Sequence, residues 1–318
     1  MTEPEELEHA ILGEHAELTG DEVAHAAGLT PKQAERLWRA LGFPDAGDER
    51  AFSKLDVEAL TRVERFMTQG RLDFDTIVRL TRGMGTTMDR LAEWEVAALT
   101  AAVEAKPEVS SRRAEAMRLV ETVGPDFEAL LSYAWRRHLA AAVARVESLT
   151  AGDEHVETTV GFADLVRFSE LTNDLDEDQI GNLVEQFESR SHDVVSRHRA
   201  RVVKTLGDSV LFMATTPDEG FEIAWDIVRV IGGDERLPDV RVGVVTGPVV
   251  LRMGDVYGPA VNLAARLVTV ARRNRVITDA QTAARLSRDR FDTRTLPARP
   301  VRGFGDLEPV AVRRLSGR

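Results

Sequence analysis

Residues 201–214 read RVVKTLGDSVLFMA, two apolar runs on either side of a glycine and an aspartate. A Gly-Asp step between two runs of strand-forming residues predicts a β-hairpin with Asp208 in its turn. Lys204 is expected to share a strand face with Val202 and Leu206, where an apolar residue would be usual. Two interpretations stay open: the ammonium group reaches past the strand to solvent, or it is a hydrogen-bond donor directed into a cleft.

The sequence on both sides of this hairpin alternates between short strands and helices from about residue 156 onward. Further strands are expected at 158–164, 240–247, 248–254, 275–279 and 309–315, and helices at 176–198, 218–231, 259–267 and 280–286. Strands and helices mixed in this order predict an α+β domain of about 160 residues.

The first third of the chain predicts helices only. In the stretch LTPKQAERLWRALGF (29–43), Thr30 is expected to be the N-cap and Pro31 the first helical residue. Gln33 completes a capping-box pattern with Thr30. The spacing of apolar residues around Leu37 then predicts one buried face.

A second helical segment is expected to connect this region to the α+β domain. After a break at 105–116, apolar residues at helical spacing predict a helix from about Asp126, just after Gly124 and Pro125, to about Glu147. We therefore divide the chain into an all-helical domain, a linker helix and the α+β domain, at 1–125, 126–152 and 153–318.

Composition narrows the classes of function. The chain has 318 residues, no cysteine and a net charge of −12. The absence of cysteine excludes disulfides, thiolate metal sites and cysteine nucleophiles, and fits the cytoplasm. The acidic N-terminus lacks a signal-peptide pattern, and no apolar run is long enough to be a transmembrane segment.

The acidic charge is concentrated at the start of the chain. The first 110 residues hold 22 acidic and 12 basic residues, which disfavours nucleic acid and anionic membranes as partners. However, DEVAHAAGLTPKQAERLWRALGF (21–43) has the rhythm of a helix-turn-helix with Gly28 at its turn. A DNA-binding regulator with a nucleotide-sensing domain therefore stays open as an alternative.

Two carboxylates are expected at strand ends, Asp164 and Asp208. A sheet can hold such side chains rigidly while leaving them exposed, and Mg²⁺ takes few protein oxygens besides those of its substrate's phosphates. In the alternative interpretation Asp164 caps a helix and Asp208 is only a turn residue.

The stretch DVYGPAVNLAARL (255–267) places two polar side chains, Asn262 and Arg266, four residues apart on one helix face. Asp255 lies one short loop upstream. The residues alone are equally compatible with a salt-bridged helix face.

Taken together, three stretches resemble the catalytic domain of class III adenylyl and guanylyl cyclases over about residues 156–314: FADLVRFSELT, VVKTLGDSVLF and GDVYGPAVNLAARL. The resemblance implies a ferredoxin-like, palm-type mixed sheet with helices. It also implies conversion of ATP to 3′,5′-cyclic AMP and pyrophosphate with two Mg²⁺ or Mn²⁺ ions per site. The implied roles are metal binding, adenine recognition, ribose orientation and transition-state stabilisation, and they fall in that order on Asp164 and Asp208, Lys204 and Asp255, Asn262, and Arg266.

The family pattern also indicates what the chain does not share. Guanylyl cyclases typically carry glutamate and cysteine where this chain has Lys204 and Asp255, which favours ATP. A family lysine that contacts the phosphates is replaced by Arg302, which keeps the charge but not the geometry. The segment between TGPVV and Asp255 is short, so a dimerisation arm is expected to be trimmed.

In the family, active sites lie between two catalytic domains, so the resemblance implies a homodimer with two composite sites. The helical half resembles the regulatory domain of two-domain actinobacterial cyclases, which implies that it restrains or licenses the catalytic domain. We expect restraint. His138 and His155 lie on the route between the two and are candidate regulatory, pH-sensing residues. The alternative within this resemblance is a catalytically weak nucleotide-binding dimer.

Overall fold

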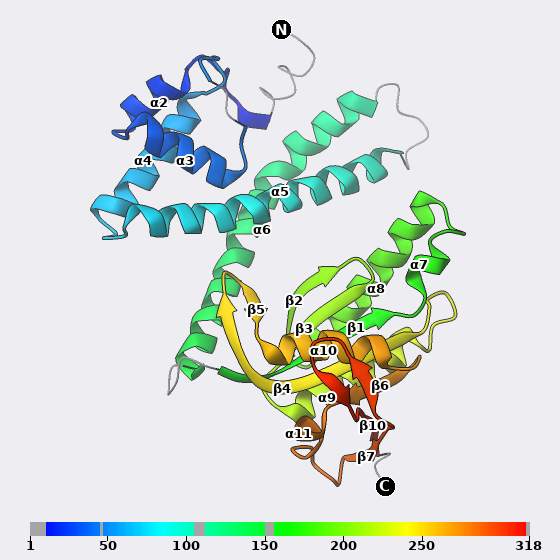
Figure 1. The fold of residues 1–318 in the computed structure, drawn as a ribbon. Coiled ribbons are helices and arrows are strands. Elements are labelled where there is room, and N and C mark those ends of the chain that lie inside the picture. The colour runs from blue at the N-terminus through cyan, green and yellow to red at the C-terminus, as the bar shows by residue number, and fades with distance from the viewer. Residues whose placement is uncertain (1–10, 45–46, 105–111, 150–155, 316–318) are drawn as a thin grey trace. The chain divides into compact units, whose positions relative to one another are not determined.

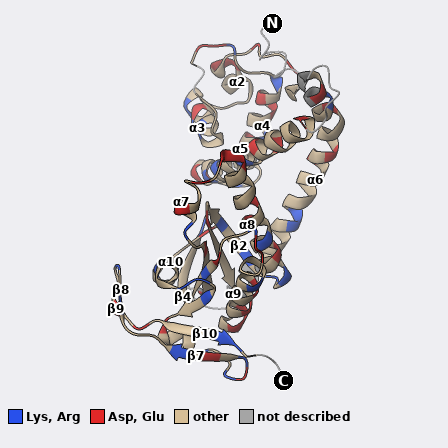
Figure 2. Ribbon diagram, turned by 90° about the vertical axis from the view of Figure 1, so that its right-hand side faces the viewer, with Lys and Arg blue, Asp and Glu red and all other residues tan. Residues whose placement is uncertain are grey.

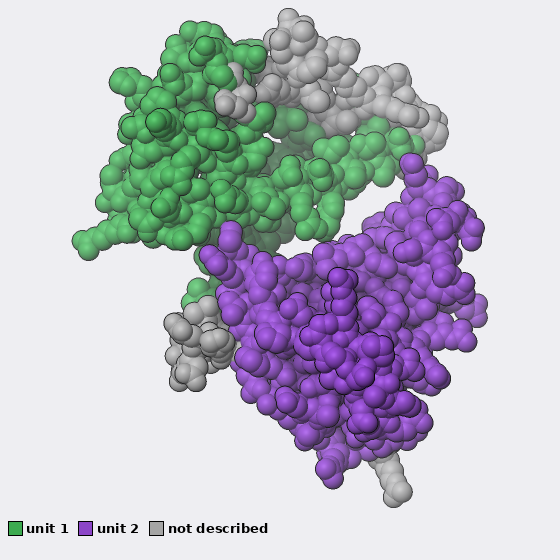
Figure 3. Space-filling model, in the orientation of Figure 1, with its two compact units in different colours: residues 1–145 green, residues 146–318 purple. Residues whose placement is uncertain are grey.

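The computed structural model describes residues 11–44, 47–104, 112–149 and 156–315. It divides into two compact units, residues 1–145 and 146–318 (Figure 3). The first unit is helical, and the second contains the sheets (Figure 1).

The helical unit contains α2 Gly20–Ala26, α3 Pro31–Leu41, α4 Lys54–Thr68, α5 Phe74–Glu104 and α6 Arg112–Leu149. The predicted start of α3 is confirmed, because the Thr30 hydroxyl accepts a hydrogen bond from the Gln33 amide and the Gln33 side chain accepts one from the Thr30 amide. Gly28 has a φ of 74°, a left-handed conformation that glycine adopts at little cost, and it turns the chain between α2 and α3.

The core of this unit lies between α2, α3, α4 and α5, where Val23, Leu37 and Ile77 are buried. Helix α5 runs unbroken through Gly83 and Gly85. A methyl group at Gly85 would overlap the backbone of Leu41, so glycine at this position lets α3 and α5 approach closely.

The predicted start of the linker helix was wrong. Helix α6 begins at Arg112 rather than near Asp126 and continues through Gly124 and Pro125. Proline removes only one intrahelical hydrogen bond, and its fixed φ is itself helical, so a 38-residue helix can contain it. The proposed domain limits at 125 and 152 stay predictions.

The second unit is built on one large mixed sheet. Its elements are β1 Val156–Leu165, α7 Phe168–Leu171, α8 Glu177–Arg197, β2 Arg201–Leu206, β3 Ser209–Ala214, α9 Pro217–Ile231, β4 Val240–Arg252, β5 Asp255–Tyr257, α10 Pro259–Val270, β6 Arg275–Thr278, α11 Ala280–Ala283, β7 Phe291–Thr295, β8 Arg299–Val301, β9 Gly305–Leu307 and β10 Val310–Arg314. The sheet order is β2-β3-β1-β4-β6-β10-β7; β4 and β6 are parallel and the other neighbours antiparallel. The predicted α+β fold is confirmed.

Helices cover both faces of this sheet. Apolar residues of α8 and α9, such as Phe187 and Phe221, pack on one face, and those of α10, such as Ala264 and Leu267, pack on the other. The face under α10 is the one that carries Asp164, because Val160 and Phe162 of the same strand belong to the α10 core.

Two strand predictions need correction. The segments predicted as separate strands at 240–247 and 248–254 form one strand, β4, which keeps pairing with β1 through Pro248 and then forms a short hairpin with β5. In β2, the register shifts between Val202 and Lys204. This β-bulge puts Val202 opposite Phe212 and Lys204 opposite Leu211, so the two side chains lie on opposite faces, not on one.

Candidate active site

The two aspartates at strand ends are brought together. Asp164 lies near the end of β1, opposite Ser209, and Asp208 is in the turn between β2 and β3. The Leu165 amide donates a hydrogen bond to the Asp208 carbonyl at 3.0 Å, which fixes the turn against the end of β1. Both carboxylates therefore belong to one rigid corner of the sheet.

This corner has an excess of negative charge. Asp164 is 8% exposed; it accepts a hydrogen bond from the Ser209 hydroxyl at 2.6 Å and forms an ion pair with Arg241 at 2.6 Å. Burial raises the pKa of Asp208, and the charge of Asp164 raises it further. Asp208 has no comparable cationic partner among the described residues, which is the situation that a bound cation relieves.

The donor set fits a divalent metal ion such as Mg²⁺. Among the described residues no group of three or more His, Cys, Asp or Glu side chains is placed to hold a metal. Mg²⁺ needs no such cage, because it binds through one or two carboxylates and takes its other oxygens from water and substrate phosphates. Asp164 and Asp208 supply those carboxylates.

Arg241 is a candidate site residue that the sequence did not indicate. It lies on β4 directly opposite Asp164, and its guanidinium also donates to the Thr269 carbonyl at the end of α10. An isolated arginine in an alternating strand resembles an ordinary exposed side chain. Only the register of β1 against β4 shows that it faces a carboxylate.

Lys204 and Asp255 form a second polar pair. The lysine ammonium donates to the Asp255 carboxylate at 2.6 Å, and the side chains are 35% and 24% exposed. Burial alone would raise the pKa of Asp255, but hydrogen bonds from Lys204 and the Val256 amide outweigh it and lower the pKa below its ordinary value. The bulge in β2 turns Lys204 toward β5, so the interpretation as a donor in a cleft fits better than a solvent-exposed lysine.

Asn262 and Arg266 are exposed on α10, on the side away from the buried Ala264 and Leu267. No hydrogen bond or ion pair of either side chain is found within the part of the chain that the structure describes. A salt-bridged helix face is therefore not what holds them. Both side chains point away from the sheet face that carries Asp164.

The remaining candidates are not part of this arrangement. Arg302 is exposed in the turn of β8 and β9, a two-stranded sheet separate from the main one, and no contact joins it to the aspartates in the described ranges. His138 is exposed on α6, and His155 lies outside the described residues. His198, which was not singled out, hydrogen-bonds Asp226 at 2.9 Å.

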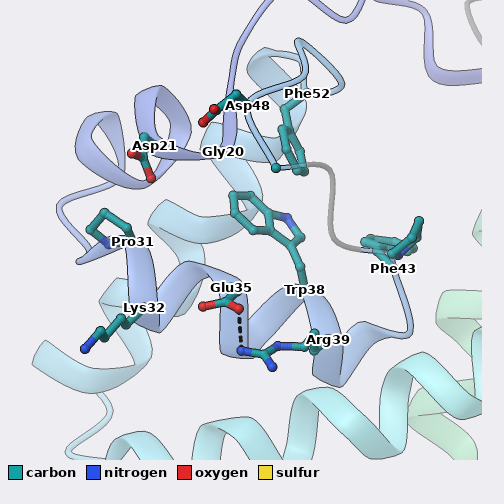
Figure 4. Close-up of a pocket in the computed structure, with 12 residues that line it drawn as sticks. Gly20, Asp21, Pro31, Lys32, Glu35, Trp38, Arg39, Phe43, Asp48 and Phe52 are labelled. Atoms are coloured by element: carbon teal, nitrogen blue, oxygen red, sulfur yellow. Dashed lines mark hydrogen bonds and ion pairs between the residues drawn. The ribbon is translucent and has the colours of Figure 1, made fainter.

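The helical unit has a pocket of its own, of about 250 Å³ (Figure 4). Its inner wall is the stacked pair of Trp38 and Phe52, whose ring centroids lie 4.3 Å apart. Glu35 and Arg39 form an ion pair along α3 at its edge, and Lys32 lies nearby. This combination of aromatic and charged groups suits a small amphipathic molecule.

None of the helices in the described ranges is both long and apolar enough to cross a bilayer.

Comparison with known proteins agrees with this geometry. Residues 151–313 match the sequence model of the adenylate and guanylate cyclase catalytic domain. The chain is 37% identical to an adenylate cyclase of Streptomyces coelicolor, over 98% of this chain and 90% of that protein. It is 38% identical to an adenylate cyclase of Glutamicibacter nicotianae, over 96% and 81%.

Among solved structures, the chain is similar to the catalytic core of a rhodopsin-guanylyl cyclase with converted specificity, in complex with ATPαS. The similarity covers 51% of this chain and 98% of that one. The sequence identity is 21% and the TM-score is 0.48. The family match covers residues 151–313, and the similarity to the two adenylate cyclases extends along nearly the whole chain. On those grounds the chain belongs to the class III adenylate cyclases.

Proposed function

We propose that this adenylate cyclase works as a homodimer with two active sites, each shared between the two chains. The observation that carries the proposal is the orientation of α10. Asn262 and Arg266 point away from the sheet face that holds Asp164, so one chain presents two half-sets of functional groups that do not meet. A second copy related by a two-fold axis supplies each half with its complement.

The chemistry is an in-line attack of the ribose 3′-oxygen on the α-phosphorus of ATP, with pyrophosphate leaving. Asp164 and Asp208 would hold Mg²⁺ or Mn²⁺, which would supply positive charge to the attacking and leaving oxygens. Arg241 orients Asp164. From the partner chain, Asn262 hydrogen-bonds the ribose, and Arg266 supplies positive charge where negative charge develops.

Base selection rests on the pair of Lys204 and Asp255. The ammonium donates to adenine N1, and the carboxylate accepts from the adenine amino group. Guanine presents a donor and an acceptor in the opposite places, so both protein groups would be left unpaired. The 2.6 Å contact between them keeps donor and acceptor side by side before any nucleotide arrives.

Apolar surface supports the dimer. The end of β4 and β5 form a short arm, and its Val250, Leu251, Met253 and Tyr257 side chains are between 39% and 64% exposed. The expected trimming of this arm relative to other family members stays a prediction. On α6, Leu130, Trp135 and Leu139 are also exposed. Apolar groups clustered in this way favour contact with a second protein surface.

We further propose that the helical unit restrains the catalytic unit, and that the cytoplasm, where ATP is made, is the site of the reaction. The pocket beside Trp38 and Phe52 is the place where a small effector would be sought. DNA binding is the weaker alternative. Two arginines of the second helix in the helix-turn-helix pattern, Arg36 and Arg39, are paired with Asp75 and Glu35 and are not free for phosphates.

The test is a turnover assay of the full chain with ATP or GTP and with Mg²⁺ or Mn²⁺. Cyclic AMP from ATP, lost in Asp208→Asn, is the expected result. Nucleotide binding without turnover under any of these conditions would favour the catalytically weak dimer instead.

A further inference from the structure

Five arginines surround one hollow at the far side of the sheet from β2. We call it the arginine pocket; its volume is about 560 Å³, and its basic residues are Arg272, Arg273, Arg275, Arg294 and Arg299. No acidic residue lines it. Figure 2 shows blue segments on β7 and β10 in this part of the catalytic unit.

Most of these charges lack a counter-charge. Arg273 lies 3.7 Å from Asp239, but no ion pair of the other four arginines is found among the described residues. In a chain with a net charge of −12, acidic partners are abundant elsewhere, so the segregation of five guanidinium groups is not a consequence of composition. Their mutual repulsion weakens the fold, and a bound anion would remove it.

The strand register adds to this repulsion. Arg241 of β4 is opposite Asp164 on one side and opposite Arg275 on the other. Like charges directly opposite on neighbouring strands are destabilising. The next strand, β10, carries Arg313, which pairs with Asp292 of β7 at 3.0 Å. Arg275 is thus opposite another arginine, Arg241, and no ion pair of Arg275 is found in the described part of the chain.

The floor of the arginine pocket is apolar. It is formed by Val270, Ile277, Leu296, Pro297 and Ala311. A purely inorganic anion would leave this surface in contact with water, whereas an organic phosphate could bury an apolar or planar portion against it.

We propose that the arginine pocket binds a small organic anion that carries phosphate groups. Guanidinium groups are planar, remain charged, and bind phosphate oxygens in pairs. The concave shape and limited volume favour a small molecule over a nucleic-acid duplex, which needs an extended basic surface. None of the residues that line the pocket belongs to the Lys204 and Asp255 pair or to the corner of Asp164, Asp208 and Arg241, so we treat it as a separate site that adjoins the proposed nucleotide site where Arg275 is opposite Arg241.

The test is titration calorimetry of the full-length protein with inorganic tripolyphosphate in buffer containing EDTA. The variant is Arg294→Gln with Arg299→Gln; both side chains are exposed and neither has a role in the proposed active site. We expect its affinity for tripolyphosphate to fall by at least about tenfold, as loss of two charge-assisted contacts requires. Arg288→Gln, an exposed arginine of the same unit outside the pocket, is the matched control and should change affinity by less than about twofold.

Two further experiments distinguish a lipid phosphate from a soluble one and test whether positive charge in the arginine pocket is what binds it. Vesicles of phosphatidylcholine with phosphatidic acid test whether a lipid headgroup is the ligand; loss of binding in the double variant, in either this arm or the soluble one, supports the pocket. Retention of charge in Arg294→Lys with Arg299→Lys should restore part of the affinity, and melting curves confirm that each variant is folded.

Three results would overturn the proposal: no saturable binding in either arm, an equal loss in Arg288→Gln, or a loss in Arg266→Ala with none in the double variant. Tighter binding of a short DNA duplex through the same arginines would also overturn it, because the occupant would then be a nucleic acid. Because the measurement is binding without metal, it can fail while cyclase activity is intact, and the reverse.

Discussion

Lys204 and Asp255 neutralise each other when no nucleotide is bound, so a base must compete with an existing ion pair. Under the proposed base selection, adenine would do so because it offers an acceptor to the ammonium and a donor to the carboxylate in one plane. Selectivity then comes from the penalty of leaving either group unpaired beside the wrong base.

Replacing Lys204 by Glu together with Asp255 by Cys should lower the ratio of kcat/KM for ATP to that for GTP by at least about tenfold, because the donor and acceptor preferences are reversed or removed. Cyclic nucleotide formation from both substrates is measured side by side. Arg288→Glu provides a charge reversal outside the site and should leave the ratio unchanged. An unaltered ratio in the double variant would mean that other residues recognise the base.

Asp208 gives a prediction about stability and pH. Since its folded-state pKa is raised, the folded chain binds more protons than the unfolded chain between the ordinary Asp pKa and the raised one. Its contribution to stability therefore falls as pH rises through this window and is unfavourable above it. In EDTA at about pH 7, Asp208→Asn should melt at a higher temperature than the parent, and the gain should shrink toward about pH 4.

Thermal unfolding of the variant at both pH values checks this, with Asp289→Asn as an exposed control for which no gain is expected. A lower melting temperature at about pH 7 would contradict the account. The same variant should lose the stabilisation that Mg²⁺ or Mn²⁺ gives the parent, because it removes a metal ligand.

For individual residues, the sequence predicted the identity of the candidate site residues better than the directions of their side chains. The two aspartates and the pair of Lys204 with Asp255 meet as expected. The face of Lys204 was wrong because a bulge inserts one residue without disturbing the apolar pattern. Arg241 was missed because its partner is distant in sequence and is found only through strand register.

Helices were predicted well where caps mark them and poorly where no cap does. Thr30, Pro31 and Gln33 fix the start of α3 by local hydrogen bonds, which sequence alone can show. Asp73 likewise caps the start of α5, because its carboxylate accepts a hydrogen bond from the Thr76 amide at 2.8 Å. In α6, by contrast, Gly124 and Pro125 were taken as a boundary, and the helix runs through both. Packing against neighbours decides such cases, and it is not visible in a single segment.

Gly85 of α5 tests one such packing decision. Gly85→Ala should destabilise the helical unit by about 1–3 kcal/mol, because the added methyl group overlaps the Leu41 backbone, which cannot rotate away. Gly83→Ala, two residues away in the same helix with open space around it, should instead be neutral or stabilising by about 0.5–1 kcal/mol. Urea unfolding of both variants measures the difference; equal effects would show that the crossing is not tight.

At the scale of the whole molecule, shared sites predict complementation. Asp164→Ala and Arg266→Ala homodimers should each be nearly inactive. Random mixing makes half of the dimers mixed, each with one intact site of two, so about a quarter of parental activity should return. Co-expressed, differently tagged chains are assayed for cyclic AMP. Absence of recovery in verified mixed dimers would rule out sites shared between chains.

Restraint by the helical unit predicts that a chain beginning near Glu154 is more active per site than the full chain at neutral pH. The reason is that a bistable packing of α6 would no longer hold the catalytic unit in its less active state. Since the exposed apolar residues of α6 are proposed to contact the second chain, both proteins are compared above the dimerisation concentration. A truncated chain with equal or lower activity would contradict restraint, and superimposable pH profiles would exclude the helical unit as the pH sensor.

A small tilt of α5 at its crossing with α3, at Gly85, is enlarged along the length of the helix. No methyl group fits between Gly85 and the end of α3, so the two helices are in close contact at this point. From this crossing α5 continues to Glu104, about 19 residues or roughly 28 Å at 1.5 Å per residue. A tilt of about 5° at the crossing, small enough to leave the packing of Gly85 against α3 intact, moves the far end of α5 by roughly 2–3 Å. A ligand that shifts α3 slightly would thereby move the far end of α5 by a distance comparable to the width of a side chain.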